Sequence, residues 1–176
     1  MSSMIEIRKC GITSTGADAV VNAANRYLRE GSGVCGAIFR AAGSRQLQDA
    51  CDRIGGCKTG KAVITDGFAL SRYIIHAVGP VYQDGKHHES QDLYSCYRCS
   101  LDLAKEYDCH SIAFPLISSG IYGYPKKDAW RKALQACGDW IRENKDISIQ
   151  IIFTVIDDGL YDLGISTAEE LGILVK

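Results

Sequence analysis

Residues 18–43, DAVVNAANRYLREGSGVCGAIFRAAG, decide the fold of this chain. A short apolar run (AVV) is typical of a strand, and Gly31, Gly33 and Gly36 follow in a GxGxxG spacing that leads into the apolar helical run AIFRAA. Glycines let a backbone approach a ligand, and the free N–H groups of a helix's first turn favour a phosphate or diphosphate. GxGxxG alone is a weak signal, so a merely structural glycine turn is the alternative.

Strand-like runs alternate with helical ones along the chain, which predicts an α/β layer fold in one domain of residues 1–176. The predicted strands cover residues 5–9, 19–22, 61–65, 73–78, 111–115 and 148–155. The predicted helices cover residues 36–42, 45–54, 91–107 and 128–143, with a last turn near 167–171. The runs AFPLI and IQIIFTVI alternate little, as central strands do when helices cover both faces of a sheet.

Charge and composition restrict the possible partners. The chain has 20 basic and 21 acidic residues, so no cationic field predicts binding of duplex nucleic acid. The apolar stretch 147–156 is too short to span a bilayer, and the start MSSMIEIRK lacks a secretory pattern. We therefore expect a cytoplasmic protein that does not bind membranes. Its eight cysteines are then expected to be reduced, mostly as small core residues.

A second glycine loop follows a predicted strand in FPLISSGIYGYP, residues 114–125. Gly120 and Gly123 bracket an aliphatic and an aromatic residue, and Ser118 and Ser119 offer hydroxyl groups. Ligands gather at the carboxyl ends of strands in α/β sheets, so this loop and the first one could hold a diphosphate between them. The alternative is a tight connection whose tyrosines cover the core.

Four motifs in this order, VVNAAN, GSGVCGAIFRAAG, HAVGPVY and FPLISSGIYGYP, resemble a macrodomain, and most closely the bacterial hydrolase branch of that family. The resemblance covers about residues 5–161. It implies a three-layer αβα fold with a mixed, mostly parallel six-stranded sheet, and a ligand of ADP-ribose or an ADP-ribosylated molecule at the sheet's crest. It implies no cofactor and no metal.

The resemblance also implies roles for individual residues. Asn25 would hold the distal ribose, with Asn22 supporting the loop beneath it. The residues implied to line the ligand are Gly11, Ile12, Asn22, Asn25, Gly33, Val34, Cys35, Gly36, Ser118, Ser119, Gly120, Ile121, Tyr122, Gly123 and Ile156. The candidate catalytic residues are Asn25 and Cys35.

The chain departs from the family pattern at Cys35, where similar hydrolases carry an Asp that orients or activates water. A thiol has a pKa near 8.5 and is a poor base at neutral pH unless the helix N-terminus and Asn25 depress that pKa. Three interpretations of Cys35 stay open: a thiol with a depressed pKa that acts as the base, a thiol with a covalent role, or a small residue that shapes the ribose pocket.

The adenine end departs as well. The family's first strand usually ends KGDIT, whose Asp accepts a hydrogen bond from adenine, whereas this chain reads KCGIT in residues 9–13. Ile156 stands where the family often has a stacking aromatic. Ile12 N–H, Asp157 or Asp158 could still contact the base. The two departures predict relaxed base recognition, with affinity carried by the diphosphate and distal ribose.

Other motifs receive simpler interpretations. The phosphate-loop imitation GGCKTGK is rejected because Ala62 replaces its hydroxyl residue and a strand follows. Cys51, Cys57, Cys96 and Cys99 lack a second ligand pair for zinc. His76, inside YIIHAV, is expected to be a hydrogen-bonded core residue, His87, His88 and Glu89 a solvated turn, and Asp128 a helix cap.

Three functions compete on the sequence alone. The first is hydrolysis of ester-linked ADP-ribose, on O-acetyl-ADP-ribose or on a mono-ADP-ribosylated protein. The second is a non-catalytic module that binds ADP-ribose or a related nucleotide with altered adenine recognition, which Cys35 favours. The third, a thiol-based redox or metal protein, rests only on the number of cysteines.

Overall fold

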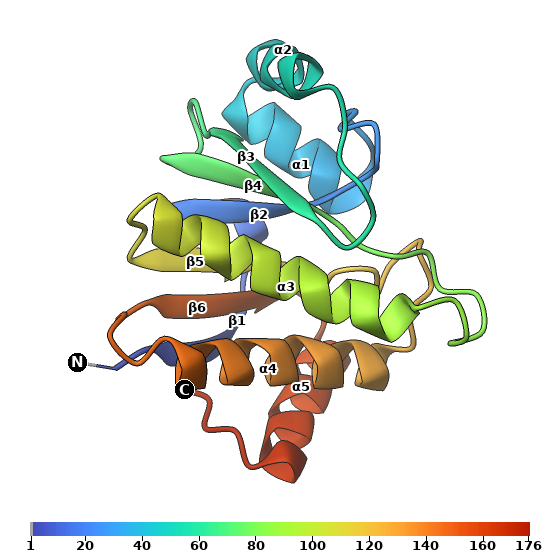
Figure 1. The fold of residues 1–176 in the computed structure, drawn as a ribbon, viewed down its shortest axis with the longest axis vertical. Coiled ribbons are helices and arrows are strands. Elements are labelled where there is room, and N and C mark those ends of the chain that lie inside the picture. The colour runs from blue at the N-terminus through green and yellow to red at the C-terminus, as the bar shows by residue number, and fades with distance from the viewer. Residues whose placement is uncertain (1) are drawn as a thin grey trace.

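The apolar runs of the sequence become the middle of one six-stranded sheet in the computed structural model, which describes residues 2–176 (Figure 1). The strands are β1 Met4–Lys9, β2 Ala19–Ala24, β3 Ala62–Asp66, β4 Tyr73–Val78, β5 Ser111–Phe114 and β6 Gln150–Val155. The helices are α1 Gly33–Ala42, α2 Ser44–Ile54, α3 Glu89–Glu106, α4 Lys126–Glu143 and α5 Asp158–Leu171, with a 3₁₀ turn η1 at Ile12–Ser14.

The strand order is β1-β6-β5-β2-β4-β3, and every pair is parallel except β3 with β4. This confirms the predicted mixed, mostly parallel six-stranded sheet. The carboxyl ends of the five parallel strands therefore meet at one edge of the sheet, where the loops after β1, β2, β4, β5 and β6 also lie.

Helices cover both faces of the sheet. α1 and α2 pack with Val20 and Ile74 on one face, and α3 and α4 run side by side on the other, with α5 next to α4 (Figure 1). On the α3–α4 face Phe153 contacts the aromatic rings of Tyr97, Phe114 and Trp130. The two buried cores confirm the predicted three-layer αβα fold.

β2 and β5 are neighbours whose outgoing connections diverge. The chain leaves β2 toward α1 on one face and leaves β5 toward α4 on the other. In open α/β sheets such a divergence opens a crevice at the carboxyl ends of the two strands. The two glycine loops of the sequence both start at this crevice.

Three sequence predictions about helix ends are wrong. α1 begins at Gly33, three residues before the expected start. α5 runs from Asp158 to Leu171 where only a last turn was predicted, since Gly159 and Gly164 weaken its helical pattern. Asp128 is no cap, because α4 begins at Lys126 after Pro125.

The C-terminal residues return to the first strand. Val175 forms a parallel bridge with Ile5, and Lys176 N–H donates to Ile5 O at 2.9 Å. β1 thus has β6 on one side and this short segment on the other.

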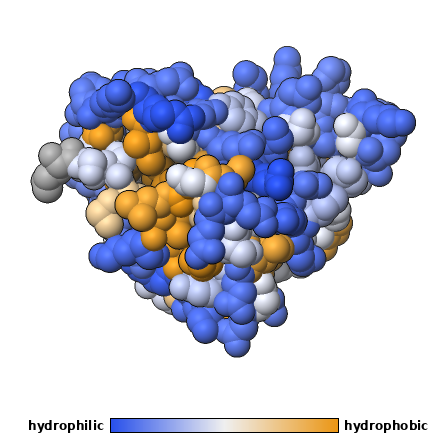
Figure 2. All heavy atoms as spheres, turned by 90° about the horizontal axis from the view of Figure 1, so that it is seen from below, coloured by the Kyte–Doolittle hydropathy of each residue, from blue (hydrophilic) through white to orange (hydrophobic). Residues whose placement is uncertain are grey.

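The surface is mostly hydrophilic on the face seen in Figure 2, where the largest hydrophobic area lies left of the centre. Within residues 2–176, no helix is both long and apolar enough to cross a membrane. All eight cysteines carry free thiols, and Cys35, Cys51, Cys96, Cys109 and Cys137 are buried. This agrees with their interpretation as small core residues.

Candidate functional site

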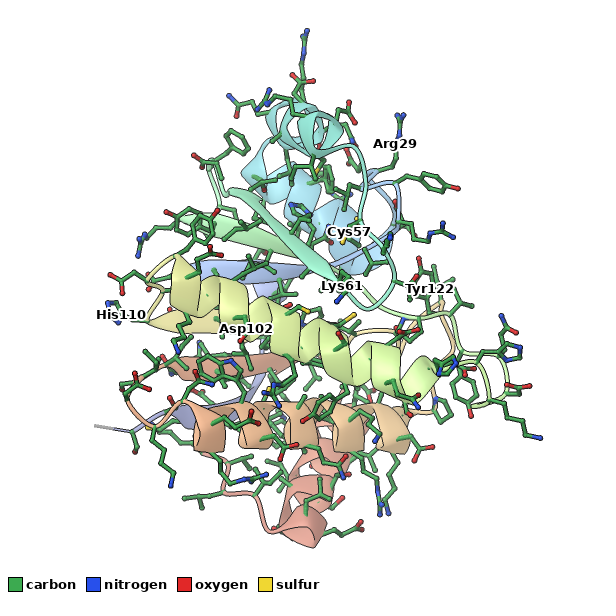
Figure 3. All side chains as sticks on the ribbon, viewed as in Figure 1. Arg29, Cys57, Lys61, Asp102, His110 and Tyr122 are labelled. Carbon is green, nitrogen blue, oxygen red and sulfur yellow. The ribbon has the colours of Figure 1, made fainter. Side chains whose placement is uncertain are left out.

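The first loop starts with a turn that Asn25 organises. Its Oδ1 accepts hydrogen bonds from the N–H groups of Tyr27 at 3.2 Å and Arg29 at 3.0 Å, while its Nδ2 donates to Arg29 O at 2.9 Å. Leu28, with φ of 56°, buries its side chain beneath the turn and leaves Arg29 pointing outward (Figure 3). Contact of Asn25 with a ribose stays a prediction, and these bonds show how its position is fixed.

Gly33 and Gly36 place the start of α1 close to the loop before it. Gly33 has φ of 59°, a conformation that favours glycine. A Cβ atom on Gly36 would lie 2.6 Å from Gly31 O, so no side chain fits there. The first N–H groups of α1, at Gly33, Val34 and Cys35, have no partner within the helix, which is what anion binding at a helix start requires.

The second loop is held by its own backbone. Ser118 has φ of 67°, Tyr124 N–H donates to Ser118 O at 2.9 Å, and Gly123 N–H donates to Gly120 O at 2.9 Å. Ile121 at its tip is 89% exposed. The Ser119 hydroxyl donates to Leu116 O at 2.7 Å, so its proton is already used within the loop.

The loop after β4 supports the second loop from behind. Tyr82 N–H donates to Tyr122 O at 2.8 Å, and a Cβ atom on Gly79 would lie 2.3 Å from Ser118 Oγ. The HAVGP motif in the sequence does not by itself predict this role of Gly79. The strand-ending glycine before Pro80 is the signal that could have indicated it.

Two buried side-chain atoms in the described residues 2–176 have no hydrogen-bond partner: Asn22 Oδ1 and Ser118 Oγ. Asn22 lies in β2, two residues before the strand ends, and Ser118 lies in the second loop. Buried polar atoms are nearly always paired, and an unpaired one costs roughly 1–3 kcal/mol. Both unpaired atoms of this protein thus fall under the two loops of the crevice.

Cys35 is 8% exposed, and its thiol donates to Arg29 O at 3.8 Å. Burial raises the pKa of this thiol, and hydrogen bonds from Gly31 N–H and the Asn22 side chain only partly oppose the rise. The hypothesis of a depressed thiol pKa is therefore wrong, because desolvation outweighs the helix N-terminus. Cys35 is protonated at neutral pH.

The adenine end offers few side-chain contacts. Gly11 precedes the 3₁₀ turn, Ile12 is buried at its start, and Ile156 after β6 is 84% exposed. Asp157 caps α5 by accepting from Leu160 N–H at 2.7 Å. Lys9 donates to Asp158 at 2.9 Å. Both carboxylates are thus engaged near the position where an adenine acceptor was expected.

His76 is a fully buried, hydrogen-bonded core residue, as predicted. The polar loop also has a structural role: Glu89 accepts hydrogen bonds from the N–H groups of Gln83, Asp84, Gly85 and His87. Asp84, His87 and Glu89 lie close enough together to hold a metal ion, but the Glu89 carboxylate is occupied by these four N–H groups. The prediction of a solvated turn holds for the exposed His87 and His88 but is wrong for Glu89, which is buried because its carboxylate binds the backbone of the turn.

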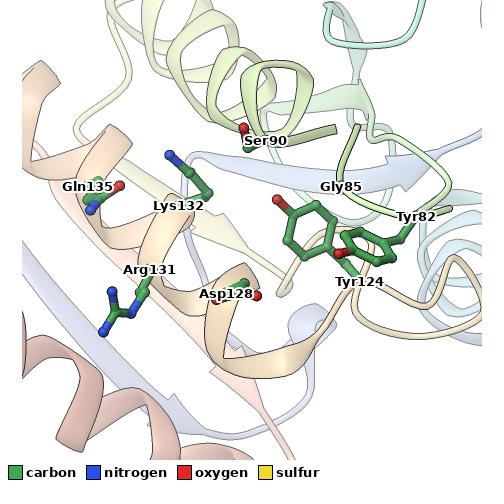
Figure 4. A pocket seen from close by; sticks show the side chains of 8 residues that line it. All are labelled: Tyr82, Gly85, Ser90, Tyr124, Asp128, Arg131, Lys132 and Gln135. Atoms are coloured by element: carbon green, nitrogen blue, oxygen red, sulfur yellow. The ribbon is translucent and has the colours of Figure 1, made fainter. Parts of the chain in front are cut away.

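A hollow of about 320 Å³ lies away from the crevice, between the loop after β4 and the side of α4 (Figure 4). It is lined by Tyr82, Gly85, Ser90, Tyr124, Asp128, Arg131, Lys132 and Gln135. None of the predicted ligand residues lines it. The predicted ligand residues lie instead mostly in the two glycine loops that follow β2 and β5.

The fold and the site together define an α/β protein in which two backbone loops face each other across the ends of adjacent parallel strands. The profile of the family described as Macro domain matches residues 21–133. This chain belongs to the macro domain family.

Sequence relatives cover nearly the whole chain. A macro domain-containing protein of Chlorobaculum tepidum is 47% identical over 156 residues, which are 88% of this chain and 90% of that protein. One of Listeria monocytogenes is 48% identical over 159 residues, with the same coverage.

Solved structures agree with the fold. The Oceanobacillus iheyensis macrodomain with ADP superposes with a TM-score of 0.87 at 36% identity, covering 95% of this chain and 90% of that one. The Trypanosoma brucei macrodomain in complex with ADP-ribose gives a TM-score of 0.84 at 35% identity, covering 91% and 67%.

Proposed function

We propose that this protein binds ADP-ribose in the groove between its two glycine loops, with the diphosphate held by backbone N–H groups and the distal ribose near Asn25 and Cys35. Structures of two similar macrodomains hold ADP or ADP-ribose. The first turn of α1 supplies N–H groups at one side of the groove, and residues 119–123 form the other side. Recognition by backbone atoms needs no net positive charge.

The observation that carries the proposal is the position of the two unpaired buried atoms, Asn22 Oδ1 and Ser118 Oγ. A native protein keeps such atoms mainly where a ligand or water is to meet them. Here one atom belongs to β2, which leads into the first loop, and the other to the second loop, which follows the neighbouring strand β5.

Isothermal titration calorimetry tests binding by comparing ADP-ribose, ADP and ribose 5-phosphate. We expect ADP-ribose to bind more tightly than ADP, because only ADP-ribose carries the distal ribose, and both to bind more tightly than ribose 5-phosphate, which lacks the diphosphate. Equal heats for all three ligands would contradict the proposal.

We further propose slow hydrolysis of ADP-ribose esters. Water adds to the ester carbonyl carbon, the bond from that carbon to the ribose oxygen breaks, and the proton passes to the ribose oxygen. Cys35 is no base, so the substrate's own phosphate would have to take up the water's proton. Positioning alone can supply roughly 7–11 kcal/mol. Loss of a general base, about 10²- to 10⁴-fold, need not abolish turnover.

The raised pKa of Cys35 also favours a second candidate function, a reader that binds ADP-ribose on a partner without hydrolysing it. The variant Cys35→Asp separates the two functions. We expect it to increase hydrolysis of O-acetyl-ADP-ribose by about 10²- to 10⁴-fold, while the Kd for ADP-ribose stays within a few-fold. Cys35→Asn is the matched control, because asparagine has the size of aspartate but cannot act as a base.

The wild-type protein decides between enzyme and reader. Turnover above that of Asn25→Ala supports the enzyme, whereas no wild-type turnover together with a gain in Cys35→Asp supports the reader. Equal activity in Cys35→Asp and Cys35→Asn would refute a missing base at position 35.

A further inference from the structure

A buried chain of polar side chains runs across three neighbouring strands beneath the groove. His76 on β4 lies opposite Asn22 on β2, and its Nδ1 is 3.1 Å from Asn22 Nδ2. On its other side His76 Nε2 is 3.0 Å from the hydroxyl oxygen of Thr65 on β3. Asn22 is 1% exposed and His76 is fully buried, so solvent does not compete for these bonds.

The hydrogen bonds among Thr65, His76 and Asn22 fit one assignment of donors and acceptors. The Thr65 hydroxyl donates to Asp66 O at 3.0 Å, so its oxygen is left to accept a proton from His76 Nε2. A neutral imidazole with a proton on Nε2 has a bare Nδ1, which accepts from Asn22 Nδ2. The Cys51 thiol also faces Nε2, but at 3.8 Å its sulfur is a weaker partner than the Thr65 oxygen.

The direction of these hydrogen bonds determines which atoms of the Asn22 amide remain free for other partners. An amide nitrogen has two N–H groups, and one of them is used by His76. The Asn22 side chain acts to lower the pKa of the Cys35 thiol, as a nearby N–H donor does, which indicates that the second N–H group lies on the side of position 35. Asn22 Oδ1 is then the atom without a partner, in agreement with the unpaired atoms described above.

We propose that Thr65 and His76 are positioning residues that hold the Asn22 amide in one orientation, with an N–H group directed at the side chain of residue 35. A flipped amide would present its carbonyl oxygen there instead. An N–H group stabilises an anion, either a thiolate or a carboxylate. The protein therefore carries a donor already placed for a carboxylate at position 35, although its own residue there is a neutral thiol.

The first test measures the tautomer of His76 in the full-length protein without ligand. Long-range ¹H–¹⁵N spectra distinguish a protonated Nε2 from a protonated Nδ1. His76 is recognised as the ring that stays neutral between pH 5 and 8, because burial lowers its pKa to about 4. We expect the proton on Nε2. A proton on Nδ1 would overturn the proposal.

The second test measures alkylation of Cys35 as a function of pH, followed by mass spectrometry of the peptide that contains it. His76→Leu removes the acceptor that holds the amide. Losing an N–H bond to the thiolate raises the thiol pKa by about one unit, so alkylation at a fixed pH becomes about tenfold slower. His76→Gln offers a carbonyl oxygen to Asn22 and is expected to recover much of the rate.

A matched pair of variants controls for buried hydroxyl groups. Thr65→Val removes the hydroxyl that faces His76, whereas Thr154→Val removes an equally buried one that donates to Phe114 O at 3.3 Å. We expect slower Cys35 alkylation in Thr65→Val only. An unchanged or faster rate in folded His76→Leu and Thr65→Val would contradict the proposal. Neither test uses ADP-ribose, so their outcome is independent of the proposed ligand.

Discussion

Gly36 shows how little room the first loop leaves for a side chain. Its missing Cβ atom would lie 2.6 Å from Gly31 O and 3.0 Å from the Arg40 guanidinium. Gly31 lies in the same loop, but a Cβ atom there would meet nothing nearer than Cys35 Sγ at 3.8 Å. Close packing therefore requires a glycine at position 36, whereas position 31 has room for a larger residue.

Gly36→Ala is therefore expected to lower the free energy of unfolding by about 1–3 kcal/mol and to weaken ADP-ribose binding, because the loop must move to admit a methyl group. Gly31→Ala is the matched control and is expected to change the stability by less than about 0.5 kcal/mol. Urea unfolding and calorimetry measure both effects. Equal stability of the two variants would show that the contact at Gly36 is not restrictive.

At the scale of elements, α5 is the helix that sequence patterns failed to predict in full. Gly164 in its middle lowers helix propensity, yet a Cβ atom there would lie 2.7 Å from the Trp130 ring. The ring occupies the space that any larger residue would need. Local propensity was therefore overruled by packing between α4 and α5.

We expect Gly164→Ala to destabilise the protein by about 1–3 kcal/mol even though alanine is the better helix former. Gly138→Ala in α4 is the comparison, since its Cβ atom would make an ordinary 3.6 Å contact with Ile173. The free energy of unfolding of Gly138→Ala is expected to rise by about 0.5–1 kcal/mol. Thermal and urea unfolding distinguish the two, and a stabilised Gly164→Ala would refute the packing argument.

Buried titratable groups on different elements make the whole molecule sensitive to acid. Burial lowers the pKa of His76 to about 4, below its usual 6.5. Burial of Glu89 opposes its ionisation, but the N–H groups of Gln83, His87 and Gly85 lower its pKa to about 2. In both cases the unfolded chain binds the proton more readily than the folded protein, so acid favours unfolding.

The pKa of His76 is about 2.5 units lower in the folded protein than in the unfolded chain, and each unit corresponds to about 1.36 kcal/mol. The free energy of unfolding is therefore expected to fall by roughly 3 kcal/mol between pH 6.5 and pH 4 as His76 becomes protonated. Between pH 4.5 and pH 2 the loss through Glu89 follows. Urea unfolding as a function of pH measures both losses. His76→Gln should flatten only the upper range and Glu89→Gln only the lower one; an unchanged upper range in folded His76→Gln would contradict the assignment.

Patterns of hydrophobic residues and glycines predicted the sheet, its layers and the two loops. What the sequence could not reveal depends on contacts between distant residues. Burial of Cys35, which raises its pKa, follows from how the first loop folds over it. The contact of Gly79 with Ser118 joins two loops that are 39 positions apart, and the inward bonds of Asn25 depend on the turn it forms.

The bridge between Ile5 and Val175 has a consequence for association. An outer strand with free backbone groups can recruit a strand from another molecule and extend the sheet into an aggregate. On β1 the C-terminal residues already pair with Ile5, so an incoming chain would first have to displace them. Val175 and Lys176 thus oppose intermolecular extension of the sheet at Ile5.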